Sequence, residues 1–187
     1  MDTMKWLLAA FLVVGSSFAF AQAKSDDHPT VPKVLDFLVS DVEGEFVLAA
    51  EAMPEDKYAY APTNGEFKGV RTFAQQVKHV AAMNYIIGAS IIGENPPVDV
   101  GSGNGPDSMT AKADIIKFLK DSFAYAHRAS GSVNEKSMLE PIKNPFGEGT
   151  TTRLGMSGIL VGHCFDHYGQ MVEYLRMNGI VPPASRP

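Results

Sequence analysis

The chain has 187 residues, of which 45% are hydrophobic, so it can form one domain with an ordinary buried core. Sixteen lysines and arginines against 21 acidic residues give a formal net charge of −5. This balance argues against a nucleic-acid-binding protein, and no basic amphipathic stretch points to a membrane surface.

Residues 1–21 have the pattern of a secretory signal peptide. Lys5 precedes an apolar stretch that begins at Trp6, and the small residues of a cleavage site end at Ala21. The apolar stretch is shorter than the roughly 20 residues of a membrane-spanning helix, although an uncleaved N-terminal anchor is the alternative interpretation. We therefore expect export, to the periplasm or outside the cell, with residues 22–30 as a flexible leader. No membrane span is expected after cleavage.

Four segments with helical periodicity follow the leader. The expected fold is an all-α four-helix bundle over residues 31–183, with no strands. In the first helix, the apolar stripe Val34, Leu35, Leu38, Val42, Phe46 and Ala49 is expected to face the core. The four helices are expected from about Val31 to Met53, from Val70 or Arg71 to about Ile92, after a cap at Ser108 or Thr110, and from near Thr152 to Asn178-Gly179.

Two of the connections, Gly93–Pro106 and Gly131–Thr151, are long for a bundle. Loops of this length inside a compact domain are uncommon unless they have a function. We expect them to cover one end of the bundle.

His163 and His167 are separated by four residues in the fourth helix. This spacing places both imidazoles on one helix face, with Cβ atoms about 5–6 Å apart, where one divalent ion can bind both. The ion would need a further ligand from another helix, and His79 lies on the second one. The alternatives are a chance histidine pair and a core histidine at position 79. His28 lies in the leader, and His127 suits the negative end of the third helix dipole.

The segment His163-Cys164-Phe165-Asp166-His167 excludes the mechanism of one well-known zinc protease class. Those enzymes use H-E-x-x-H, in which the glutamate is the general base, and Cys164 occupies that position here. Cys164, the only cysteine, is expected to be a small buried hydrophobic residue. A single cysteine cannot close an intramolecular disulfide, so the domain must be stable through packing alone.

Three stretches of the sequence resemble the DinB-like family, also called the YfiT-like metalloenzymes. The first consists of residues 38–54 together with Tyr58-Ala59-Tyr60-Ala61-Pro62, and the second of residues 71–80, which end in His79-Val80. The third consists of residues 163–170, 174–176 and 178–183. The resemblance extends over about residues 31–183. It implies a four-helix bundle in which His79, His163 and His167 hold one metal ion, and it implies a homodimer. Characterised members are transferases and isomerases that use bacillithiol or mycothiol. This chain departs from them in its signal peptide, so their substrates are not carried over.

Three neutral imidazoles leave an open position on the ion, as in catalytic zinc sites. Zinc is the expected ion, and nickel, iron and manganese are alternatives. Imidazole ligands also need outer hydrogen-bond partners, for which the candidates are Glu51, Asn84, Asp166 and Gln170.

The sequence identifies no general base. The leading interpretation is a metal-dependent hydrolase or transferase acting on an unknown small molecule. The alternatives are a non-catalytic periplasmic protein that binds metal or a ligand, and a structural dimer whose metal only stabilises the fold.

Overall fold

The computed structural model describes residues 28–187. The expected signal peptide, residues 1–21, and the leader up to residue 27 lie outside the described part of the chain. Within residues 28–187, no helix is both long and apolar enough to cross a membrane.

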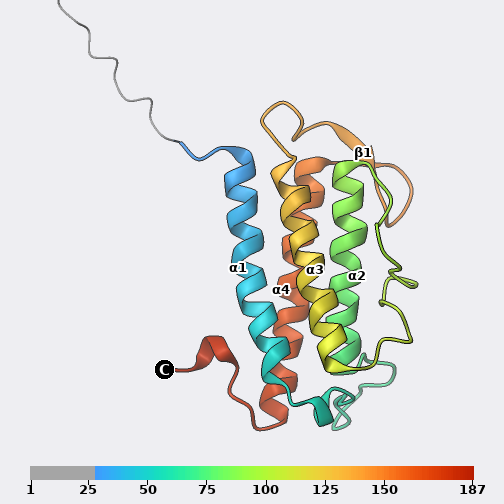
Figure 1. The fold of residues 1–187 in the computed structure, drawn as a ribbon, viewed down its shortest axis with the longest axis vertical. Helices are drawn as coiled ribbons and strands as arrows, with labels where there is room; N and C mark the ends of the chain where they lie inside the picture. Colours follow the sequence, from blue (N-terminus) through green and yellow to red (C-terminus); the bar gives the residue numbers. More distant parts are fainter. Residues whose placement is uncertain (1–27) are drawn as a thin grey trace, which may run out of the picture.

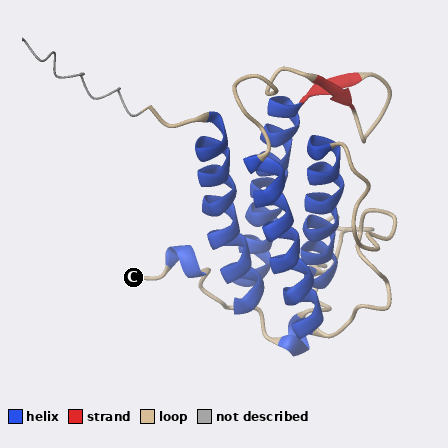
Figure 2. Ribbon diagram, turned by 45° about the horizontal axis from the view of Figure 1, so that its top comes forward, coloured by secondary structure: helices blue, strands red, loops and turns tan. Residues whose placement is uncertain are grey.

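The described chain forms a bundle of four long helices, which confirms the expected all-α fold. α1 and α2 each pack against both α3 and α4 (Figure 1). A small antiparallel hairpin was not predicted, because strands of three residues are too short to show alternation (Figure 2). The elements are α1 Val31–Ala52, η1 Glu55–Lys57, α2 Phe73–Ile92, α3 Lys112–Gly131, β1 Pro141–Lys143, β2 Thr150–Thr152, α4 Arg153–Met177 and η2 Pro183–Ser185.

The direction of the helices explains why the connection between α2 and α3 is long. In Figure 1, α2 and α3 run in the same direction, whereas α1 and α4 run in the opposite one. α2 has 20 residues, which corresponds to about 30 Å, and the chain must return over this length before α3 can begin. Residues 93–111 therefore run beside α2, whereas the connection with the hairpin covers the bundle end where α3 leads into α4. The expectation that both loops cover one end was wrong for the first of them.

Side chains at the helix starts fix where α2 and α4 begin. Thr72 and Gln75 form a reciprocal capping box, so α2 starts at Phe73 rather than at Val70 or Arg71. α4 starts directly after Thr152, as expected, and the Thr152 hydroxyl accepts the backbone N–H of Gly155.

The expected cap of the third helix was wrong. Ala111 is the N-cap of α3 and makes no side-chain capping bond, so neither Ser108 nor Thr110 fills this role. Alanine has no side-chain acceptor for the first helical N–H groups.

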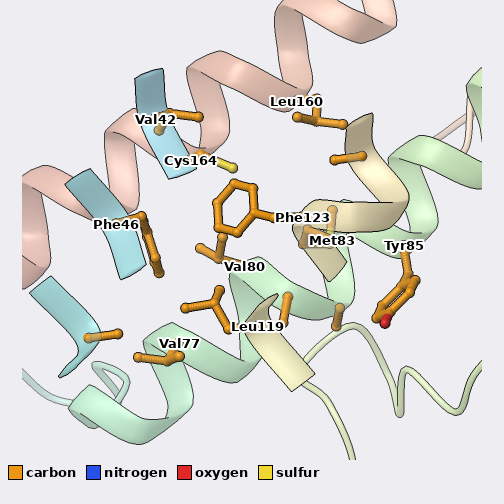
Figure 3. Packing of buried hydrophobic residues seen from close by; sticks show 14 of the residues in the cluster. Val42, Phe46, Val77, Val80, Met83, Tyr85, Leu119, Phe123, Leu160 and Cys164 are labelled. Atoms are coloured by element: carbon orange, nitrogen blue, oxygen red, sulfur yellow. The ribbon is translucent and has the colours of Figure 1, made fainter. Parts of the chain in front are cut away.

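The core lies between all four helices. It includes the fully buried side chains of Phe46, Phe123 and Leu160 (Figure 3). The expected stripe of α1 needs one correction. Val34 and Leu38 are 42% and 37% exposed, and Val39 is buried instead. A stripe with consistent three- and four-residue steps passes through Leu35, Val39, Val42, Phe46 and Ala49, and it leaves Val34 and Leu38 at its edge.

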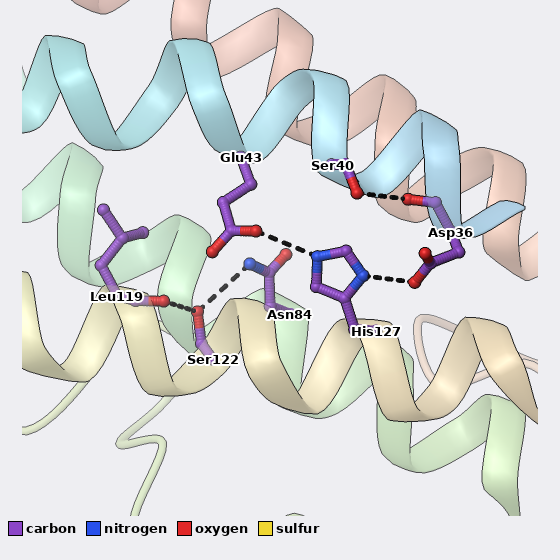
Figure 4. A network of polar contacts seen from close by, with 7 residues as sticks. All are labelled: Asp36, Ser40, Glu43, Asn84, Leu119, Ser122 and His127. Atoms are coloured by element: carbon purple, nitrogen blue, oxygen red, sulfur yellow. Dashed lines mark hydrogen bonds and ion pairs between the residues drawn. The ribbon is translucent and has the colours of Figure 1, made fainter.

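His127 joins α3 to α1 through two carboxylates (Figure 4). Its Nδ1 lies 2.6 Å from Oδ1 of Asp36, and its Nε2 lies 3.0 Å from Oε2 of Glu43. A neutral imidazole carries one N–H, so only the protonated ring can donate to both carboxylates. Burial lowers the pKa of His127, but the hydrogen bonds and negative charges of Asp36 and Glu43 outweigh it and raise the pKa above its usual value.

We predict that His127→Gln lowers stability in a pH-dependent way. Because the folded pKa is raised, the contribution of His127 is fully present below the unfolded pKa of about 6.5 and is lost as pH rises through the folded pKa. Urea unfolding should show a loss of about 1 kcal/mol near pH 5.5 that shrinks by about pH 9. The exposed His28 provides the control, His28→Gln, which should have no effect. A loss that grows with pH would contradict this assignment.

Candidate metal centre

His79, His163 and His167 come together where α2 packs on α4. One potential ligand atom from each of them lies within 4.8 Å of the others. The ring centroids of His163 and His167 are 4.5 Å apart, and both rings pack edge-on against His79, at 5.1 and 4.9 Å. The pair lies one turn apart on α4, so its shared face meets the single histidine of the neighbouring helix.

The distances suit a single ion after a small adjustment. Two nitrogens bound tetrahedrally at about 2.0–2.1 Å lie about 3.4 Å apart. Nε2 of His79 and Nε2 of His163 are 3.2 Å apart, which is close to this value. The widest pair of ligand atoms, within 4.8 Å, would have to draw together around the ion.

The backbone carbonyl of Gly103 orients His79. Nδ1 of His79 lies 2.6 Å from this oxygen. A carbonyl can only accept, so Nδ1 carries the proton, and the lone pair of the neutral ring is on Nε2, which faces His163. Gly103 has φ +83°, a conformation that side-chain-bearing residues rarely adopt. The loop between α2 and α3 thus orients His79 and leaves the lone pair of its Nε2 available to an ion.

The other two histidines are held neutral and have unpaired nitrogens. Burial, followed by the charges of His167 and His79, lowers the pKa of His163 to about 3. Burial and the charge of His79 lower the pKa of His167 to about 4. Nδ1 of each ring is buried without a hydrogen-bond partner among the described residues. An ion held by Nε2 of His163, the nitrogen that faces His79, would leave the buried Nδ1 of His163 unpaired. Neutral imidazoles are the form that binds metals. The residues therefore fit a divalent cation.

No other histidine, cysteine, aspartate or glutamate in residues 28–187 joins this cluster. A fourth ligand would then come from water or a substrate, which is the arrangement of catalytic zinc sites.

The four candidate outer partners make their hydrogen bonds elsewhere in the described part of the chain. Glu51 pairs with Lys120 on α3. Asn84 is fully buried, donates to Ser122 and accepts from the Cys164 thiol. These contacts tie helices together rather than orienting the imidazoles.

The remaining two candidates bond to one another. Asp166 accepts from the Gln170 amide at 3.1 Å, and Gln170 also accepts from Gln76 at 2.8 Å. The charge of Asp166 still reaches His163, where it opposes the lowering of the pKa.

Sequence reasoning missed two features near the histidines, the backbone carbonyl of Gly103 and the side chain of Arg71. The Gly103 carbonyl leaves no side-chain signature, although the run of glycines at 101, 103 and 105 was a sign of an unusual backbone. Arg71 was also missed as a site residue. Its Nε donates to Asn104 at 3.2 Å, and its positive charge lowers the pKa of all three histidines.

The sequence profile of the DinB superfamily matches residues 19–171. The chain belongs to this superfamily. No curated protein sequence matches it significantly.

Two crystal structures of DinB-like proteins have the same fold. The one from Bacillus subtilis is 16% identical with a TM-score of 0.60, and the match covers 78% of this chain and 92% of that one. The one from Bacillus cereus ATCC 10987 is 14% identical with a TM-score of 0.63, covering 82% and 96% of the two chains. At these identities the likeness shows the fold alone, so function must come from the site.

Cys164 lies between the two histidines of α4 in sequence but faces the core (Figure 3). It is fully buried, as expected, and burial raises the pKa of its thiol to about 12. Its Sγ donates to Asn84 instead of joining the histidine cluster.

We predict that the Cys164 thiol is inert in the folded protein, because reactivity requires the thiolate and access to solvent. A chromogenic disulfide reagent at neutral pH should detect no thiol in native protein and one thiol per chain in denaturant. Rapid reaction of the native protein would contradict the buried position.

Proposed function

We propose that this protein is an exported, metal-dependent enzyme, a hydrolase or transferase, that holds one divalent ion on His79, His163 and His167. The observation that carries the proposal is the convergence of three imidazoles from two helices, without a fourth protein ligand among the described residues. Zinc is the proposed ion, because imidazole nitrogen suits it and a three-histidine site is one of its catalytic arrangements. Export rests on the N-terminal sequence pattern alone.

A divalent ion in this position would polarise a substrate oxygen or lower the pKa of a water or thiol. The chain's own residues prepare the site for it. Gly103 keeps the proton of His79 on Nδ1, and the low pKa values of His163 and His167 keep both rings neutral at neutral pH. At His163 and His167, therefore, protons compete with the ion only at strongly acidic pH.

The site also adjoins a space for a small molecule. A cavity of about 470 Å³ lies between α2, Gln170 of α4 and the loop around Asn104; none of the three histidines lines it, but Lys78 directly precedes His79 in α2. This volume is within the range of about 300–1,000 Å³ that is typical of small-molecule sites. A protein that only stores metal needs no such cavity, which favours a site that takes a small molecule; turnover would separate the enzyme from the ligand-binding alternative.

We predict that elemental analysis of protein purified from its own compartment finds about one divalent ion per chain. His163→Ala should reduce this to almost none after desalting, because two imidazoles hold an ion far less tightly than three. The control is His28→Ala, which removes an exposed histidine outside the cluster and should keep the full metal content.

The proposal fails if wild-type protein contains no stoichiometric metal, or if His163→Ala keeps it. Circular dichroism of each variant shows whether the fold is intact, so that a loss of metal can be assigned to the missing ligand.

A further inference from the structure

The cavity of about 470 Å³ shares its walls with the three elements that hold the histidines in place. On α2 it is lined by Gln76, one turn before His79, and on α4 by Gln170, one turn after His167. Its third wall is the loop around Asn104, which follows the residue that binds His79. None of the three histidines lines the cavity, but a ligand in it would contact residues within one helical turn of His79 and His167.

Two positively charged side chains line this cavity, Arg71 and Lys78. Neither forms an ion pair within residues 28–187. The one acidic lining residue, Asp107, is exposed and pairs with neither of them. Buried or half-buried charges are normally compensated by a partner of opposite sign. An anionic ligand would supply that partner.

The Arg71 guanidinium is held in place but is not saturated with hydrogen bonds. It is half-buried, and in the described chain its one side-chain hydrogen bond runs from Nε to Oδ1 of Asn104 at 3.2 Å. Its two terminal amino groups make no hydrogen bond to any residue in 28–187. These groups form the fork that matches a carboxylate or phosphate in a bidentate way. Lys78 is 7% exposed, and its Nζ donates to the carbonyl of Pro106. The ammonium group has further N–H groups that can donate to a ligand.

Gln76 adds a buried polar group with a vacant acceptor. It is 1% exposed, its amide donates to Gln170 at 2.8 Å, and its Oε1 has no hydrogen-bond partner in residues 28–187. An acceptor of this kind is usually satisfied by a ligand or water, since it is costly to leave unpaired. A hydroxyl or amide group on the ligand could donate to it.

We infer that this cavity binds the anionic group of the substrate, a carboxylate or a phosphate, with the Arg71 guanidinium as the main contact and Lys78 as a second cation. The inference rests on the proposed function, because it names the substrate class of the same site. A divalent ion on the histidines would make the neighbouring cavity still more attractive to an anion.

Calorimetric titration of the zinc-loaded protein with succinate and with inorganic phosphate tests this inference. The two probes separate a carboxylate site from a phosphate site, and we expect one of them to bind. Arg71→Gln should weaken that binding about tenfold or more, since hydrogen bonds to charged groups contribute about 1.5–3 kcal/mol. Arg71→Lys should give an intermediate loss, because it keeps the charge but not the fork.

The matched control is Arg186→Gln, which removes an exposed arginine that does not line the cavity. It should leave the affinity unchanged. Zinc content and thermal midpoint are measured for every variant, because Arg71 also holds Asn104 and through it the loop that carries Gly103.

Three results would overturn the inference: no binding of either probe, equal affinity in Arg71→Gln and wild type, or a loss of zinc together with the anion in Arg71→Gln. The last result would show that Arg71 only supports the metal site. Protein that holds no zinc but binds an anion through Arg71 would instead refute the proposed function and leave the anion site standing.

Discussion

Three imidazole rings meet where α2 packs on α4, and two of them bury a ring nitrogen that no group in residues 28–187 satisfies. An unpaired buried nitrogen is costly in a protein interior. Protonation does not relieve it, because burial and the mutual repulsion of the rings hold the pKa values of His163 and His167 at about 3 and 4. A divalent cation could bind these neutral imidazoles through the nitrogens that face one another, such as Nε2 of His79 and of His163.

The direction of the helices connects this cluster to the rest of the fold. Because α2 and α3 run the same way, the chain between them has to pass along the bundle, and it passes His79. The carbonyl of Gly103 fixes the tautomer of His79, while Arg71 and Lys78 bind the same loop through Asn104 and Pro106. From the sequence this connection is notable only for its length. In the structure it contacts His79 through Gly103 and also lines the neighbouring cavity.

The sequence predicts some, but not all, of the parts of this structure that depend on local chemistry, since the start of α2 and the cap of α3 were missed. Thr152 and Gly179 mark the ends of α4 because capping and left-handed glycine are local effects, and the pair His163 and His167 follows from helical spacing. His79 could be joined to them only through an assumed bundle and a family resemblance, since the contact between α2 and α4 is not local. Gly103 could not be predicted at all, because a backbone carbonyl acts without a side chain. Val34 and Leu38 were expected in the core but are exposed, because a shift of one residue along a helix is enough to move a side chain from the core to the surface.

A metal-edge X-ray absorption spectrum of the purified protein tests the central claim most directly, because it reports the ion and counts its ligands. The account predicts three imidazole nitrogens at about 2.0–2.1 Å, no sulfur at about 2.3 Å, and at least one light ligand that exchanges with added anions. A closed shell of four protein ligands, a sulfur contribution from Cys164, or fewer than three imidazoles would contradict it.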